Sequence, residues 1–420
     1  MSPKKTVVAV TLSGLVGLAG AARQPYDVKK IINAFRNPPD DLTILCAHRG
    51  LRWNGTADNS YESYFRAPEA GIECVETDIR LSLDGYLPMI HDSGLGRETD
   101  VSEQTGKAAY NPFTGQGYSP KVSESNFSGF IENLHRRDEL GRVRREQVAT
   151  LPDMIQNIHE AKTNVVLQLD FKDQAAVEPA YWALKNLTNA AGIPANEWCI
   201  YKLQAEWYRS PEEFEALEWV QDAFASGIEL AFIPVYQPGD VAEWDVLASL
   251  QSFAKTNYTI SAEIELQSTG GALQHLNDYL DGDEWDGVFN SRGIFFAIGD
   301  FADPFTSNLT FFDTANYTLP DDIRTNNSVF VYRDNAAPVL LDTLANDKFH
   351  DSRSDFAWII DQGYHWVITD TADEWHHRLK DQGKRNLSSL VADGQELVDP
   401  TWGSGWYKAR RHARDLDSNI

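Results

Sequence analysis

Eight short apolar runs recur along the chain and limit the folds that it can adopt. We predict β-strands at residues 42–48, 72–81, 164–172, 198–203, 229–236, 258–266, 328–334 and 365–370. We predict helices between several of them, at 62–71, 151–161, 179–192 and 211–227. Buried strands that alternate with helices form parallel sheets with the helices outside. Eight such strands predict an α/β fold, a closed (β/α)8 TIM-type barrel, with an open doubly wound sheet as the alternative.

Two long stretches interrupt this alternation. Residues 93–147 are rich in Gly, Ser, Asn and charge, and residues 282–327 are aromatic and polar. Connections in a compact domain seldom exceed about 15 residues without structure of their own. We therefore predict a barrel of residues 42–400 with a small subdomain inserted at about 93–147, after the second strand. A long insertion is predicted at about 282–327 and a C-terminal tail at 401–420.

The N-terminal residues have the layout of a targeting segment. Lys4 and Lys5 precede an apolar run of small residues that ends near Ala21 or Ala22. This order is typical of a secretory signal peptide, which we place at residues 1–22, with a transmembrane anchor as the alternative. No other segment reaches the roughly 18 apolar residues that a membrane span needs. We expect a secreted protein without a stable membrane anchor.

Eight Asn-x-Ser/Thr triplets support export, because such triplets accept N-linked glycans in secreted proteins. They begin at Asn54, Asn126, Asn186, Asn257, Asn308, Asn316, Asn326 and Asn386. The formal net charge of −25 argues against a nucleic-acid partner, because phosphate neutralisation needs clustered Lys and Arg. The sequence leaves the oligomeric state open.

Carboxylates occur near the ends of two predicted strands. Glu76 and Asp78 share one face of the second strand, and Asp170 shares a face with Lys172 on the third. The carboxyl ends of barrel strands meet at one mouth, so the three acids are expected to converge there. Hard cations prefer such oxygen ligands, which predicts a site for one divalent cation, Mg²⁺ or Ca²⁺. Structural salt bridges to Arg80 or Lys172 are the alternative.

Two histidines end apolar runs in the same region. His48 ends the first predicted strand, and His91 follows a short apolar run that comes after a turn signal at Asp84-Gly85. Two imidazoles suit a displacement that removes one proton and delivers another near neutral pH. Arg49 and Lys172 would offer fixed positive charge to an anionic substrate. By strand position alone, the pocket is also expected to include Lys202, Glu263, Glu265 and Trp366.

These residues stand in an order that resembles the glycerophosphodiester phosphodiesterase family, within the phosphatidylinositol-phospholipase-C-like barrels. The resemblance is carried by His-Arg-Gly at 48–50, by residues 57–100 and by Leu-Asp-Phe-Lys at 169–172. Residues 329–335 and 363–373 resemble the last two strands of the family. The resemblance implies that His48 and His91 are the acid–base pair. It further implies metal ligation by Glu76, Asp78 and Asp170, phosphate contacts from Arg49 and Lys172, and an inserted subdomain after His91.

Two positions depart from the family pattern. Ala57-Asp58 replaces Pro-Glu before Asn59, which reshapes the first loop, and Asp170 replaces a glutamate, which shortens one ligand by a methylene. The resemblance implies metal-dependent hydrolysis of glycerophosphodiesters to an alcohol and glycerol phosphate. A related phospholipid-cleaving barrel of the phospholipase C or D kind is one alternative. A glycoside hydrolase that uses Glu263 and Glu265, or a non-catalytic binding protein, is an alternative of another class.

The chain has only three cysteines, too few for a disulfide scaffold. Cys46 and Cys74 each lie two residues before a predicted site residue, on adjacent strands. Adjacent parallel strands seldom present good disulfide geometry, so we expect two buried free thiols there, with a disulfide as the alternative. Cys199 is predicted to be a buried hydrophobic residue. We expect His376 and His377 to lie in a surface helix, with structural or solvated roles.

Overall fold

The structure is a computed structural model that describes residues 23–400, apart from 53–55, 111–114, 139–140, 284, 297–351, 355 and 399. Three predictions therefore fall outside the described residues. They are the signal peptide at 1–22, the strand at 328–334 and the tail at 401–420.

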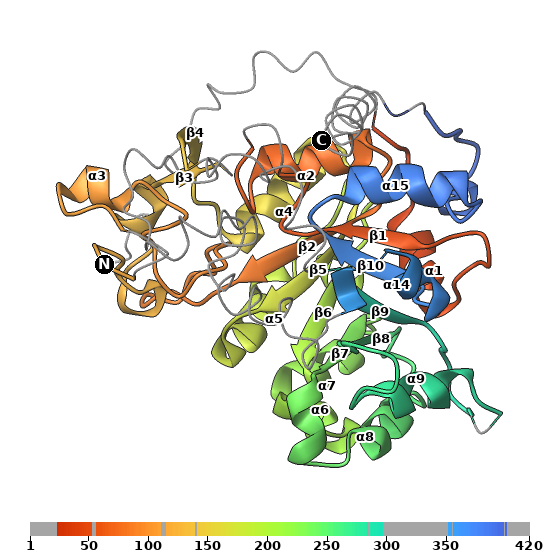
Figure 1. Ribbon diagram of the computed structural model, residues 1–420. Helices are drawn as coiled ribbons and strands as arrows, with labels where there is room; N and C mark the ends of the chain where they lie inside the picture. Colours follow the sequence, from red (N-terminus) through yellow and green to blue (C-terminus); the bar gives the residue numbers. More distant parts are fainter. Residues whose placement is uncertain are drawn as a thin grey trace, which may run out of the picture.

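Eight parallel strands close into a barrel, which confirms the predicted fold (Figure 1). The strands are β1 (Ile44–Ala47), β2 (Cys74–Ile79), β5 (Val166–Phe171), β6 (Cys199–Gln204), β7 (Phe232–Tyr236), β8 (Ala262–Ile264), β9 (Arg292–Phe296) and β10 (Trp366–Thr369). Each strand pairs with the next in this order, and β10 pairs with β1 to close the ring. Side chains of alternate residues therefore fill the interior of the barrel.

The seventh barrel strand is β9, and the prediction that residues 328–334 form it was wrong. β9 lies in the stretch that we had assigned to the long insertion, and it pairs with both β8 and β10. Its Gly293 faces Trp366, where a Cβ atom would lie only 1.9 Å from the indole ring. A bulky residue cannot occupy position 293. The apolar run of β9 is therefore short, and the sequence pattern does not indicate a strand there.

Helices cover the outside of the barrel (Figure 1). They are α1 (Val28–Arg36), α2 (Tyr61–Glu69), α4 (Leu151–Glu160), α5 (Val177–Leu184), α6 (Pro211–Glu215), α7 (Glu218–Ala225), α8 (Val246–Phe253), α9 (Gln274–Asp281), α14 (Phe356–Asp361) and α15 (Ala372–Asp381). Capping boxes at Ser60 and Thr150 fix the first turns of α2 and α4. Among the described residues, no helix is both long and apolar enough to cross a membrane.

The segment between β2 and α4 packs around a small core of its own. It contains α3 (Val101–Thr105) and the antiparallel pair β3 (His135–Arg137) and β4 (Val143–Gln147). Its buried apolar side chains are Ile90, Leu95, Val101, Val122, Phe127, Ile131, Leu134 and Val148. Figure 1 shows these elements beside the barrel, at the end toward which β2 points. The predicted domain boundaries themselves stay predictions.

Cys46 and Cys74 form a disulfide, so the expectation of two free thiols was wrong. The two residues are register partners on β1 and β2, and their Cα atoms lie 4.3 Å apart. Both side chains point into the barrel, where exact register brings the two sulfur atoms together. Cys199 is a buried free cysteine, as predicted.

Candidate active site

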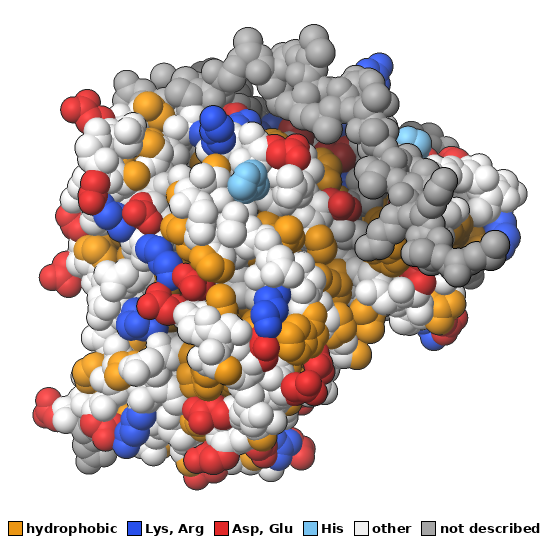
Figure 2. All heavy atoms as spheres, turned by 180° about the vertical axis from the view of Figure 1, so that it is seen from behind, with side chains coloured by type: hydrophobic (Ala, Val, Ile, Leu, Met, Phe, Trp, Pro, Cys, Tyr) orange, Lys and Arg blue, Asp and Glu red, His pale blue; other side chains and the backbone are white. Residues whose placement is uncertain are grey.

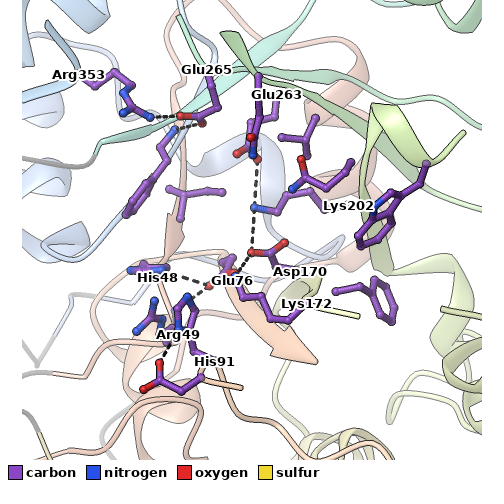
Figure 3. A pocket seen from close by; sticks show the side chains of 18 of the residues that line it. His48, Arg49, Glu76, His91, Asp170, Lys172, Lys202, Glu263, Glu265 and Arg353 are labelled. Carbon is purple, nitrogen blue, oxygen red and sulfur yellow. Dashed lines mark hydrogen bonds and ion pairs between the residues drawn. The ribbon is translucent and has the colours of Figure 1, made fainter. Parts of the chain in front are cut away.

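A cavity of about 760 Å³ opens at the carboxyl ends of the barrel strands (Figure 3). Its charged and imidazole side chains are His48, Arg49, Arg52, Glu76, His91, Asp92, Arg97, Asp170, Lys172, Lys202, Glu263, Glu265 and Arg353. Its other lining residues include Phe171, Gln204, Trp207, Val235, Gln237, Pro238, Gln267, Phe295 and Ile368. Charged groups of both signs dominate the wall, so the cavity suits a polar, charged ligand.

His48 stands at the end of β1 in a fixed orientation. Its Nδ1 donates to Asp370 Oδ1 at 2.7 Å, and Arg52 also pairs with Asp370. The opposite nitrogen, Nε2, lies 4.0 Å from Glu76 Oε2. Burial and the nearby Arg49 lower the pKa of His48, although Asp370 opposes the shift. Its Nε2 is therefore presented to the acidic cluster while Asp370 holds the opposite nitrogen.

The turn after His48 requires unusual backbone angles. Arg49 has φ of +57° and Gly50 has φ of +86°. A Cβ atom at Gly50 would lie 2.3 Å from Ser63 Oγ on α2, so only glycine fits this close approach. The turn brings the Arg49 N–H to Glu76 Oε2 at 3.1 Å and directs the guanidinium toward Asp78 (3.1 Å) and Asp58 (3.2 Å).

Three carboxylates meet beside His48. Glu76, Asp78 and Asp170 each offer an oxygen, and these oxygens lie within 4.8 Å of one another. Glu76 and Asp78 come from β2 and Asp170 from β5, where it is the register partner of Asp78. Asp78 is fully buried behind the cavity wall, and the Asn59 amide donates to its Oδ2 at 2.9 Å. The three acids are brought together as predicted.

Lys172 balances part of this negative charge. Its Nζ lies 2.9 Å from Asp78 Oδ1 and 2.6 Å from Asp170 Oδ2. Burial raises the pKa of Asp78, but Lys172 and Arg49 outweigh it and hold that pKa well below its usual range. Burial and the neighbouring acids Asp78 and Asp170 raise the pKa of Glu76.

The donor set fits a divalent cation. Three carboxylates at one point are the oxygen ligands that Mg²⁺ and Ca²⁺ prefer, and the open cavity leaves room for water and substrate oxygens. The alternative of structural salt bridges holds only in part. Lys172 pairs with two of the acids, whereas Arg80 pairs instead with Asp173 at 3.0 Å.

His91 lies on the cavity wall below Arg49 in Figure 3. Its Nδ1 donates to Asp92 Oδ1 at 2.9 Å, and Arg97 grips Asp92 with two hydrogen bonds of 2.6 and 2.7 Å. Burial and the charge of Arg49 lower the pKa of His91 to about 4, although the charge of Asp78 acts to raise it. About a third of its side chain is exposed, so His91 can reach a ligand in the cavity.

The far end of the cavity has a separate polar group of residues. Lys202 Nζ lies 3.8 Å from Asp170 Oδ2 and 3.2 Å from Glu263 Oε2, so it connects the two ends (Figure 3). Glu265 pairs with Arg353 and accepts the Phe295 N–H at 3.1 Å. Burial raises the pKa of Glu263 to about 8; the nearby Glu265 also raises this pKa, whereas Lys202 lowers it. Glu263 therefore holds a proton at neutral pH.

Sequence reasoning missed several residues of this site. Asp370, Arg52 and Asp58 form a buried network behind His48, and Asp92 and Arg97 support His91. Asp370 could have been found, because it ends the last predicted strand, as His48 ends the first. Arg353 comes from a short 3-10 turn, Ser352–Ser354, for which the sequence offers no signal.

Two smaller predictions were wrong. Trp366 does not line the cavity. It is fully buried in the barrel, where its Nε1 donates to Ser261 Oγ at 2.7 Å, because it points inward one layer below the mouth. His376 is not on the surface either. α15 turns it toward Arg385, whose Nε lies 3.2 Å from His376 Nδ1 in a buried contact.

The fold and this site define a class: a (β/α)8 barrel with an acid-and-imidazole cluster at its mouth, suited to anionic ligands. Residues 48–195 match the model of the glycerophosphoryl diester phosphodiesterase family. The resemblance predicted from the motifs is thereby confirmed.

Individual relatives agree with this assignment. The chain is 29% identical over 152 residues to glycerophosphodiester phosphodiesterase domain-containing protein 5 of Gallus gallus, covering 34% of this chain and 24% of the relative. It is 38% identical over 58 residues to a glycerophosphodiester phosphodiesterase of Caldanaerobacter subterraneus, covering 14% of this chain and 24% of the relative. The matched segments thus span about a quarter of each of these relatives.

Among solved structures, the fold is similar to a glycerophosphoryl diester phosphodiesterase from Parabacteroides distasonis. The TM-score is 0.50 at 15% identity, and the alignment covers 89% of this chain and 96% of the other. At this identity the likeness shows the shared barrel fold alone.

Proposed function

We propose that the protein is a metal-dependent phosphodiesterase that hydrolyses glycerophosphodiesters to an alcohol and glycerol phosphate. The observation that carries the proposal is the meeting of two imidazoles, three carboxylates and two fixed cations at one cavity. Hydrolysis of a diester phosphate needs charge neutralisation on the phosphate oxygens, removal of a proton from the attacking oxygen and delivery of a proton to the leaving ester oxygen. A glycoside hydrolase would need only the carboxylates and would leave His48 and His91 without a role.

Glu76, Asp78 and Asp170 would hold the divalent cation, Mg²⁺ or Ca²⁺. When bound, the cation would supply Lewis-acid neutralisation of the phosphate oxygens. Arg49 and Lys172 border the same point and add fixed positive charge, and Lys202 extends it along the cavity. A phosphate bound here therefore lies between the two imidazoles.

The two histidines then divide the proton transfers. An attacking oxygen loses its proton to one imidazole as its bond to phosphorus forms. Attack by water gives glycerol phosphate directly, whereas attack by a neighbouring glycerol hydroxyl gives a cyclic phosphate, which water must then open to glycerol phosphate. The other imidazole delivers a proton to the ester oxygen as its bond to phosphorus breaks. Asp370 and Asp92 each accept from an Nδ1, which leaves the Nε2 of both rings for this exchange. The charge of the bound phosphate favours protonation and so opposes the effect of burial on these rings.

Turnover of a panel of diesters, followed by phosphorus NMR, tests the proposal. We expect glycerol phosphate as a product, loss of activity in EDTA and recovery on adding back Mg²⁺ or Ca²⁺. His48→Ala and His91→Ala should each lower kcat by about 10²–10⁴-fold, as expected for removal of a general acid or base. His275→Ala, at a half-buried position on α9, is the matched control and should keep full activity.

Each part of the proposal has its own contrary result. Full turnover in EDTA would remove the metal from the scheme. Cleavage of intact phospholipids in preference to deacylated diesters would favour the phospholipid-cleaving alternative. Cleavage of an aryl glycoside, with all diesters left intact, would favour a glycoside hydrolase.

A further inference from the structure

We propose that the far end of the cavity binds the leaving alcohol of the diester, and that this alcohol is polyhydroxylated, of the glycerol, sugar or cyclitol type. The inference rests on the proposed function and assigns a ligand class to a group of residues that the phosphate chemistry does not use. These residues are Glu263, Glu265, Arg353, Gln204 and Gln267, together with Trp207.

The far end lies next to His48. The His48 ring packs against Phe295, with ring centroids 4.7 Å apart, and the Phe295 N–H donates to Glu265. Figure 3 shows Glu263, Glu265 and Arg353 at one end of the cavity and His91 at the other, with His48 between them. An alcohol bound at the far end therefore places its ester oxygen beside His48, which assigns to His48 the proton that the leaving oxygen receives.

The polar groups at this end suit hydroxyl groups. The amides of Gln204 and Gln267 line the cavity, and an amide offers both donors and an acceptor. Glu263 is 97% buried, and the partner of its Oε2 is the Lys202 ammonium at 3.2 Å, in an ion pair whose geometry falls short of a well-directed hydrogen bond. A carboxyl oxygen has two lone pairs, so this oxygen at the cavity wall can accept a further hydrogen bond from a ligand hydroxyl. A ring or chain carrying several hydroxyls can satisfy all of these groups, with Trp207 against its carbon face.

The same residues disfavour a quaternary ammonium alcohol. Glu265 is already neutralised by Arg353, and Glu263 lies against Lys202, so neither carboxylate is left to attract a second cation. Recognition of a quaternary ammonium needs several aromatic faces free of competing cations. Here Lys202 and Arg353 face the bound group instead. A choline-type alcohol would find no unpaired negative charge to attract it, whereas a polyol would meet matched donors and acceptors.

The test compares two diesters that share the glycerol half, sn-glycero-3-phosphoinositol and sn-glycero-3-phosphocholine. We expect kcat/KM to favour the inositol diester by about tenfold or more, because unpaired polar groups penalise the wrong alcohol. Gln204→Leu should lower the inositol-to-choline ratio of kcat/KM by about tenfold, the effect of losing one hydrogen bond. Gln156→Leu, on the outer face of α4, is the matched control and should leave the ratio unchanged.

Product inhibition of the unaltered protein gives an independent measurement that needs no variant. Free inositol or glycerol should inhibit competitively at concentrations at which choline does not. Equal or preferred cleavage of the choline diester would overturn the inference and leave the proposed function standing. Failure to cleave either diester would overturn the inference, and failure to cleave every diester of the panel would overturn the proposed function as well.

Discussion

At the scale of single residues, the orientation of His48 depends on an acid that makes no contact with the cavity. Asp370 is absent from the cavity lining, yet it accepts from His48 Nδ1 and pairs with Arg52, which in turn pairs with Asp58. All of these partners are buried. Asp370 is therefore a positioning residue: it fixes the tautomer in which Nε2 faces the acidic cluster.

Asp370→Asn tests this role. The side chain keeps its shape but can present an N–H to Nδ1, which favours the wrong tautomer of His48. We expect kcat to fall by about 10²-fold or more, with little change in KM or in divalent-cation affinity measured by calorimetry. Asp286→Asn, at an exposed ion pair with Lys255, is the control. An equal loss of cation affinity in Asp370→Asn would show that the carboxylate holds the acidic cluster instead.

Most residues of the candidate site could be predicted because of two simple regularities. Strand side chains alternate faces, and parallel strand ends meet at one mouth, so Glu76, Asp78 and Asp170 had to converge. Arg353 and the Arg52–Asp58 pair could not be predicted. Their positions depend on turns whose course is set by tertiary packing, and a single sequence carries no record of it.

At the scale of elements, the disulfide joins β1 and β2 directly below the site. Cys46 and Cys74 enclose a loop with a sequence separation of 28. Closing such a loop in the unfolded chain is expected to add about 3–4 kcal/mol to the free energy of unfolding.

The Cys46→Ala/Cys74→Ala variant should therefore lose about that much free energy of unfolding in denaturant titrations. Thiol titration of the denatured, unreduced protein should detect only Cys199, and all three cysteines should react after reduction. Detection of three thiols before reduction would contradict the disulfide. Cys199→Ala, a buried site outside the pair, is the control for loss of cysteine packing.

The docking of α15 against the barrel should make stability depend on pH. His376 is buried beside Arg385, and burial together with that guanidinium lowers its pKa to about 2. The unfolded chain takes up a proton at about pH 6.5, whereas the folded protein does not. The unfolded state then binds more protons, so stability falls as pH drops below about 6.5.

His376→Asn keeps an acceptor near Arg385 but cannot be protonated. Between pH 4.5 and 6.5, the free energy of unfolding of this variant should vary less steeply with pH, by up to about 1.4 kcal/mol per pH unit. Urea midpoints measured across this range check the difference. Gln156→Asn, at an exposed position on α4, removes no titratable group and should keep the slope of the unaltered protein. Parallel curves for His376→Asn and the unaltered protein would refute the assignment.

The positions of strands were predictable where clear turn signals flank the strand. They were predicted wrongly where tertiary packing, and not the local apolar pattern, decides which residue a strand position can hold. Seven of the predicted strands overlap observed barrel strands. β9 was missed because Gly293 must make room for Trp366, a constraint that arises only after β10 is in place. The sixth barrel strand, β8, is much shorter than the predicted run at 258–266.

At the scale of the whole molecule, we propose that the protein is secreted and glycosylated. The described acceptor residues, Asn126, Asn186, Asn257 and Asn386, are all exposed. The other four lie outside the described residues. Figure 2 shows acidic side chains scattered among basic ones on one face of the molecule, in keeping with a net charge of −25.

Expression through a eukaryotic secretory pathway tests this proposal. The secreted protein should lose mass on treatment with an N-glycosidase, and Asn186→Gln should remove one glycan, detectable by mass spectrometry. Gln174→Asn, which creates no Asn-x-Ser/Thr triplet, is the control. Retention of the protein inside the cell, or no change in mass on enzyme treatment, would refute the proposal.

The position of Trp366 determines how ligands can enter and leave the barrel. Its ring fills the interior against Gly293, one layer below Ile368, which lines the cavity. Within the described residues, the barrel is thus closed at the floor. In the proposed phosphodiesterase, substrate would enter and both product fragments would leave through the same opening. The fragment that leaves second would block the next substrate, so its dissociation would limit turnover.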